Sequence, residues 1–172
     1  MRNRLISVTR IMMQVFIIAN ITLGCAFVFG LLLSFPFERA LAARLVAKYG
    51  SEVDSVGVID ALRVLAIVGI GSAFVVHQVL VPMRAILATV STGDPFIMAN
   101  ADRLTRIGWG LLGVQIINLA VGGFVRWLAI YGIDTATWTP QFGGWLGVLL
   151  AFVLARVFRR GAEMRDDLAM TV

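Results

Sequence analysis

The chain has 172 residues, and its 15 Lys and Arg against 10 Asp and Glu give a net charge of +5. Hydrophobic residues make up 59% and charged residues 15%, whereas soluble globular proteins average about 45–50% and about 25%. This composition excludes a soluble domain, a disordered chain and, with a single cysteine, a disulfide-stabilised secreted domain. We therefore expect a chain that is solvated by lipid.

Four runs of 19 to 27 uncharged residues divide the chain. They lie between Arg10 and Glu38, Arg63 and Arg84, Arg106 and Arg126, and Asp134 and Arg156. A helix needs about 20 residues to cross a hydrocarbon core ~30 Å thick, so each run is long enough to span once. The sequence predicts an all-α integral membrane protein whose single domain, 1–172, has four transmembrane helices at about 11–35, 64–81, 107–125 and 142–158.

The positions of Lys and Arg predict the orientation of these spans. Ten of the 15 lie before the first span, in the loop 82–106 or from Arg156 onward, and five lie in the other two loops. Basic residues concentrate on the cytoplasmic side of membrane proteins. We expect both termini and the 82–106 loop in the cytoplasm, the loop 36–63 in the periplasm, and the chain as a multi-pass protein of the bacterial cytoplasmic (inner) membrane.

The loop 36–63 contains a candidate amphipathic helix. Bulky apolar or aromatic side chains recur every four residues at Phe37, Leu41, Leu45 and Tyr49, and Gly50 follows them. This spacing aligns the four side chains on one face of a helix, and glycine is a common residue just after a helix end. We expect a helix over 37–49 that lies along the outer leaflet.

The loop 82–106 is expected to form a helical hairpin that extends the second and third spans. Beyond Pro82, apolar residues at helical spacing continue the helix, namely Met83, Ile86, Leu87 and Val90. Gly93 suits the left-handed conformation that ends a helix, Asp94 is a good N-cap, and Pro95 suits the first helical position. A second helical arm then leads into the third span.

Small residues recur every four positions along the fourth predicted span, at Gly143, Gly147, Ala151 and Ala155. Helices in a bilayer associate through close packing at such residues. The stripe indicates either packing within the chain or formation of a homodimer.

Six polar side chains lie within the predicted spans: Gln14, Asn20, His77, Gln78, Gln115 and Asn118. They suit interhelical hydrogen bonds, or a path for protons or a substrate in a small transporter or channel. No acid lies at membrane depth and no catalytic motif is present, so we do not expect an enzyme. The lone histidine excludes a bis-histidine haem site, and we expect no metal and no cofactor.

The tail, 159–172, is expected to be a helical cytoplasmic extension. Arg159 and Arg160 suit lipid headgroups or a protein partner, and the apolar end, residues 168–172, favours a protein partner. The basic residues after Phe158 are not interleaved with aromatic residues, so we do not expect direct binding of nucleic acid.

The loop and the tail together resemble a bacterial family of four-span membrane proteins of unknown function, whose members are often encoded beside a short Xre-type helix-turn-helix regulator. The positions that carry the resemblance are Gly93, Pro95, Phe96, Asn100, Arg103, Leu104, Phe158, Arg159, Gly161, Thr171 and Val172. Met170 and Arg156 depart from the pattern, which has leucine and an acidic residue there. The resemblance implies a membrane protein that captures or releases a DNA-binding partner.

The sequence leaves three alternative functions for this chain. The first is a regulatory membrane protein that docks an Xre-type regulator through its inner face, formed by Asp94, Pro95, Phe96, Asn100, Arg103, Arg106, Arg159, Arg160, Leu168 and Val172. The second is an accessory or structural subunit of a larger membrane complex, bound through the small-residue stripe. The third is a small transporter or channel that uses the intramembrane polar residues.

Overall fold

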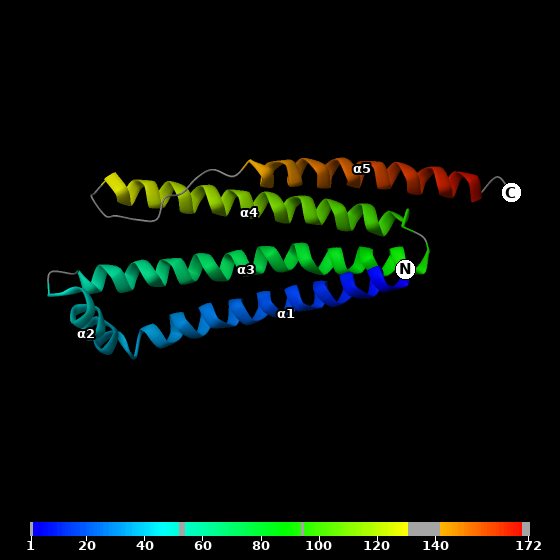
Figure 1. Cartoon of the computed structure of the whole chain (residues 1–172). Coiled ribbons are helices and arrows are strands. Elements are labelled where there is room, and N and C mark those ends of the chain that lie inside the picture. The colour runs from blue at the N-terminus through cyan, green and yellow to red at the C-terminus, as the bar shows by residue number, and fades with distance from the viewer. Residues whose placement is uncertain (1, 52–53, 94, 131–141, 170–172) are drawn as a thin grey trace. The chain divides into compact units, whose positions relative to one another are not determined.

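The computed structural model is helical, and it describes residues 2–51, 54–93, 95–130 and 142–169. Its helices follow one another in the order α1 (Arg2–Ser34), α2 (Glu38–Tyr49), α3 (Ser55–Thr92), α4 (Met98–Ile130) and α5 (Gly143–Ala169) (Figure 1). No strand occurs in the residues just given. The chain divides into two compact units, one of Ile18–Phe74 and one of Met1–Ile17 with Val75–Val172.

Among the residues that the structure describes, three helices are long and apolar enough to cross a membrane. The qualifying segments are Val8–Ser34 in α1, Ser55–Val90 in α3 and Met98–Arg126 in α4. They contain the first three predicted spans, apart from the single residue Phe35 that follows α1. Large apolar side chains on these segments remain exposed, among them Ile18, Phe29 and Phe74. A surface of this kind suits lipid as its solvent, so the chain has the character of a membrane protein.

The fourth predicted span, 142–158, is not among these segments. The uncharged part of α5 runs from Gly143 to Ala155, and its 13 residues measure about 20 Å. This is shorter than the ~30 Å hydrocarbon core. The preceding residues, 131–141, lie outside the described part of the chain. The fourth span therefore stays a prediction.

Both arms of the predicted hairpin are helical, but the second arm begins later than expected. α3 continues through Pro82 to Thr92, ten residues past the proline. Gly93 has φ +102°, the left-handed conformation expected after a helix end. α4 begins at Met98, so Pro95 is not at the first helical position and that prediction is wrong. Asp94, the predicted N-cap, lies outside the described residues.

α2 covers the segment in which an amphipathic helix is expected, and it begins at Glu38 and ends at Tyr49. Gly50 follows with φ +96°, and its N–H donates to the carbonyl of Val46 at 2.9 Å. A residue with a side chain rarely adopts this conformation, which explains why the helix ends at a glycine.

In the unit Ile18–Phe74, α1 and α3 run in opposite directions and lie in close contact. The ring of Phe27 packs where a side chain on Gly69 would stand, because a Cβ there would lie 2.7 Å from Phe27 Cε2. One turn further along, Asn20 Nδ2 donates to the carbonyl of Ala73 at 2.9 Å. Asn20 thus makes an interhelical hydrogen bond of the kind expected for the intramembrane polar residues.

Arg63 of α3 connects three helices of the same unit. It donates from Nε to Ser34 Oγ at 3.1 Å and from Nη2 to the Ser34 carbonyl at 3.1 Å and to Glu38 Oε2 at 2.7 Å. Nη1 pairs with Asp60 at 2.9 Å, and the guanidinium lies 4.3 Å from the centre of the Phe35 ring. The last carbonyls of α1 lack partners within their helix, so Arg63 both satisfies one of them and ties α2 to the junction.

In the other unit, α5 packs along α4, as Figure 1 shows. Ala151 belongs to a buried cluster with Val79 and Ile107, and Ile86, Leu104 and Leu111 surround it. The predicted small-residue stripe takes part through Gly147, Ala151 and Ala155, and it continues to Ala162, which is 1% exposed. Gly143 does not take part, because it is exposed and a Cβ on it would meet no neighbouring atom within 4 Å. Gly147, Ala151 and Ala155 therefore pack within the chain.

Candidate functional site

Three of the residues that carry the sequence resemblance, Phe96, Phe158 and Gly161, come together where α5 meets the turn between α3 and α4. The two rings of Phe96 and Phe158 lie 5.0 Å apart. A Cβ on Gly161 would lie 2.9 Å from Phe96 Cδ1, so the absence of a side chain at this position lets α5 approach the turn. The turn and the tail, expected to form one surface, are in direct contact.

Two polar contacts hold α5 at this position. Arg159 Nη2 pairs with Asp102 Oδ1 of α4 at 3.2 Å. One and a half turns later, Arg165 Nη1 donates to the carbonyl of Phe96 at 3.4 Å. Each contact is exposed and worth little by itself, since exposed ion pairs contribute about 0–1 kcal/mol. Together with the Phe96 packing, they align the last turns of α5 with the beginning of α4.

The buried side chain of Asn100 connects the two sides of the turn by hydrogen bonds. It is 0% exposed, and its Nδ2 donates to Thr89 Oγ1 at 2.7 Å and to the Pro95 carbonyl at 2.8 Å. Its Oδ1 accepts a hydrogen bond from Arg103 Nη1 at 2.8 Å. Both amide hydrogens and the amide oxygen of Asn100 therefore have partners within the chain, as a buried amide requires.

This network also explains the late start of α4. The carbonyl of Pro95 points to the buried Asn100 amide, and the carbonyl of Ile97 accepts from the Asn100 N–H at 2.9 Å. The segment 95–97 is thereby held as a non-helical connection in front of Met98.

Because Asn100 is buried, it cannot contact a partner, and its assignment to the docking surface is wrong. Arg103 is half-buried and supports the same amide.

The remaining predicted docking residues differ in accessibility. Phe96 is 42% exposed and Leu168 is 68% exposed, Arg106 and Arg160 are exposed, and Pro95 is half-buried. Val172, like Asp94, lies outside the described residues. Sequence reasoning missed Met164, which is 60% exposed. Gly161, Met164 and Leu168 follow at i, i+3 and i+7, a helical spacing that places both large side chains on the face that meets Phe96.

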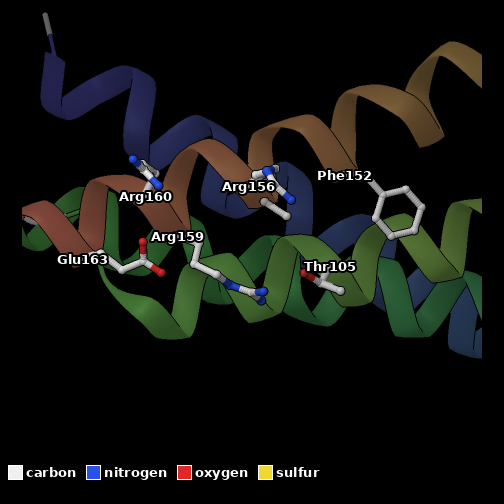
Figure 2. A pocket seen from close by; sticks show the side chains of 7 residues that line it. Thr105, Phe152, Arg156, Arg159, Arg160 and Glu163 are labelled. Atoms are coloured by element: carbon white, nitrogen blue, oxygen red, sulfur yellow. The ribbon is translucent and has the colours of Figure 1, made fainter.

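A groove of about 530 Å³ lies beside this contact, between α4 and α5. Its lining consists of Thr105, Phe152, Ala155, Arg156, Arg159, Arg160 and Glu163. Figure 2 shows that Arg159 extends toward Thr105 of α4, while Arg156 and Arg160 come from α5 one turn apart. Within the described part of the chain, neither Arg156 nor Arg160 makes an ion pair or a side-chain hydrogen bond. The spacing of the three arginines, i, i+3 and i+4, was the available sequence signal for this groove.

The polar residues of the predicted spans differ in their surroundings. Gln115 lies over Gly144 of α5, in the space that a side chain there would occupy. Gln14, Gln78 and Asn118 are exposed. His77 is half-buried, and its Nδ1 is buried without a hydrogen-bond partner among the described residues. In the same residues, no cluster of three His, Cys, Asp or Glu could hold a metal ion.

Comparison with known proteins identifies one family. A family model described as "Protein of unknown function (DUF2975)" matches residues 36–172. The match begins at the end of α1 and includes the turn, the groove and the tail. Searches of curated proteins and of solved structures find no match.

Proposed function

The chain belongs to the DUF2975 family of proteins of unknown function, and we propose that it is a regulatory protein of the bacterial cytoplasmic membrane that docks a soluble Xre-type regulator. The docking site would be the exposed surface formed by Phe96, Met164 and Leu168, which we name the corner surface. Arg106 and Arg160, both exposed, would border it.

The observation that carries this proposal is the contact of Phe96 with Phe158 and Gly161. This contact builds one surface from two segments that are more than 60 residues apart. Phe96 and Leu168 have large exposed side chains, and they lie beyond the segments that we assign to the membrane. Exposed apolar side chains outside the bilayer favour contact with a protein partner.

The proposal places α5 as a fourth span with the corner surface in the cytoplasm. The excess of basic residues on that side supports this orientation. An even number of spans then brings the turn and the tail to one side, consistent with their contact in the structure. A regulator bound there would be held away from DNA, and its release would permit DNA binding.

The test is recovery of an Xre-type regulator, the class of partner that the family resemblance implies. The tagged full-length chain is purified from its native membranes, and the regulator is quantified in the eluate. We expect Met164→Ser with Leu168→Ser to lower recovery by about tenfold or more, since exposed anchors at an interface contribute 1–2 kcal/mol or more each. Val56→Ser with Leu62→Ser is the matched control, because both residues are exposed at the opposite end of α3.

Equal recovery with the corner-surface variant and the control would contradict the docking proposal. Purification within a stable assembly of other membrane proteins would instead favour the accessory-subunit alternative. Solute flux in proteoliposomes that is lost in His77→Ala with Gln115→Ala would favour the transporter alternative.

A further inference from the structure

The groove between α4 and α5 combines two chemically different ends. Phe152 and Ala155 form an apolar wall, and they directly precede the arginines on α5. On the same face, residues toward the beginning of α5, such as Leu149 and Val153, are apolar and exposed. The groove thus changes from an apolar to a cationic lining within two helical turns, as a membrane–water boundary does.

The cationic end has guanidinium groups that are available to a ligand. Arg159 is paired with Asp102, whereas Arg156 and Arg160 have no carboxylate within 4 Å among the described residues. Two guanidinium groups one helical turn apart present forked donors, which match the oxygens of a phosphate. The net charge of the lining favours an anion.

The same end also presents hydrogen-bond acceptors. Thr105 Oγ1 donates its hydrogen to the Ala101 carbonyl at 3.0 Å, so the lone pairs of this oxygen are left to accept. The Glu163 carboxylate lines the groove as well and can only accept when it is ionised. A ligand that carries both a phosphate and hydroxyl groups would satisfy the donors and the acceptors together.

We infer that this groove binds an anionic phospholipid with a glycerol headgroup. The phosphodiester lies between Arg156 and Arg160, the headgroup hydroxyls donate to Thr105 and Glu163, and an acyl chain follows Phe152 along α5. The apolar wall favours this ligand over a free phosphate, because only a lipid supplies an acyl chain to contact the partly exposed Phe152. The inference rests on the proposed placement of α5 in the membrane, and it does not require the regulator.

Trp109 offers a direct probe of the groove. Its ring packs edge-on against Phe152 at 5.5 Å, and it is exposed. The full-length chain with Trp127, Trp138 and Trp145 changed to phenylalanine retains Trp109 as its single tryptophan. This protein is reconstituted in vesicles of phosphatidylcholine that contain 5% of a lipid with brominated acyl chains, and bromine quenching of Trp109 is measured.

We expect brominated phosphatidylglycerol to quench Trp109 more strongly than brominated phosphatidylcholine or phosphatidylethanolamine, with an apparent preference on the order of tenfold. Arg156→Gln with Arg160→Gln should reduce the preference to about that of phosphatidylcholine. The matched control, Arg84→Gln with Arg106→Gln, removes two exposed charges outside the groove lining and should retain it.

Three results would overturn the inference: equal quenching by all three brominated lipids, retention of the preference in the Arg156 and Arg160 variant, or an equal loss in the control. Binding of glycerol phosphate to the chain in phosphatidylcholine vesicles, without any preference for brominated phosphatidylglycerol, would show that the groove binds a soluble anion instead of a lipid. Because the assay contains no regulator, its outcome is independent of the docking experiment.

Discussion

Asn100 Nδ2 donates to Thr89 Oγ1 at 2.7 Å and so joins the first turn of α4 to the last turns of α3. The hydroxyl of Thr89 in turn donates to the Ile86 carbonyl at 2.7 Å. The chain of donors and acceptors thus begins at Arg103 and ends at the backbone of α3. Because the amide at its centre is buried, the shape of the whole turn depends on one side chain.

Replacement of Asn100 is therefore expected to destabilise the protein. Asn100→Ala removes three hydrogen bonds and leaves the Pro95 carbonyl without this donor, at a cost of about 2–4 kcal/mol. The measurement is thermal unfolding of the detergent-solubilised chain, followed by circular dichroism. Asn118→Ala, at an exposed position of the same helix, is the control and should change the midpoint little. Equal midpoints for the two variants would argue against this role of Asn100.

A side chain at position 161 should separate the tail from the turn. In Gly161→Val, the new Cβ would lie 2.9 Å from the Phe96 ring, and moving the ring or the helix should cost about 1–3 kcal/mol. We expect faster proteolysis after Arg165 in the solubilised protein. Gly161→Val combined with Phe96→Ala should restore much of the protection, because the smaller side chain removes the clash. Gly143→Ala, which meets no neighbour within 4 Å, should leave proteolysis unchanged.

Loss of the Arg63 guanidinium should loosen α2. Arg63→Ala leaves the Ser34 carbonyl, Glu38 and Asp60 without this donor, and its side chain is only 16% exposed. We expect amide hydrogen exchange in α2 to accelerate about tenfold or more, because hydrogen bonds to charged groups contribute about 1.5–3 kcal/mol. Arg63→Lys should recover part of the protection, since lysine retains the charge but lacks the planar fork. Unchanged exchange rates in Arg63→Ala would show that Arg63 does not hold α2 in place.

The proposed topology predicts a labelling pattern for single cysteines. The native Cys25 is replaced by serine, and Ser51→Cys and Leu168→Cys are introduced separately at exposed positions. In intact bacterial cells whose outer membrane has been made permeable, a maleimide that does not cross the inner membrane should label position 51 and spare position 168. Lysis should expose both. Labelling of both residues in intact cells would rule out an even number of spans and, with it, the cytoplasmic corner surface.

Much of the architecture follows from local properties of the sequence. The apolar runs predict the segments of α1, α3 and α4 that are suited to a membrane, and the apolar spacing ahead of Gly50 and the position of Gly93 agree with the ends of α2 and α3. Hydropathy depends on residue type alone, and a positive φ favours glycine wherever it occurs. The resemblance to a family of unknown function is also confirmed, because the motif residues can be read directly.

The predictions that the structure contradicts concern residues whose role depends on neighbours elsewhere in the chain. Asn100 is a plausible surface residue by type, yet its buried position depends on Thr89, eleven residues before it. Pro95 has the right conformation for a helix start, but its carbonyl is engaged by Asn100 and α4 begins three residues later. Gly143 has the spacing of the stripe but meets no neighbour within 4 Å, while Gly147 faces Leu111.

The sequence by itself determined that this is a helical chain for lipid surroundings and where its turns fall, because hydrophobicity and backbone freedom belong to single residues. Only the tertiary structure decided that Phe96 packs on Gly161, that Arg63 joins three helices, and that Arg156 and Arg160 line a groove. These relationships depend on which helix faces meet, and in a largely apolar chain many faces are equally able to pack.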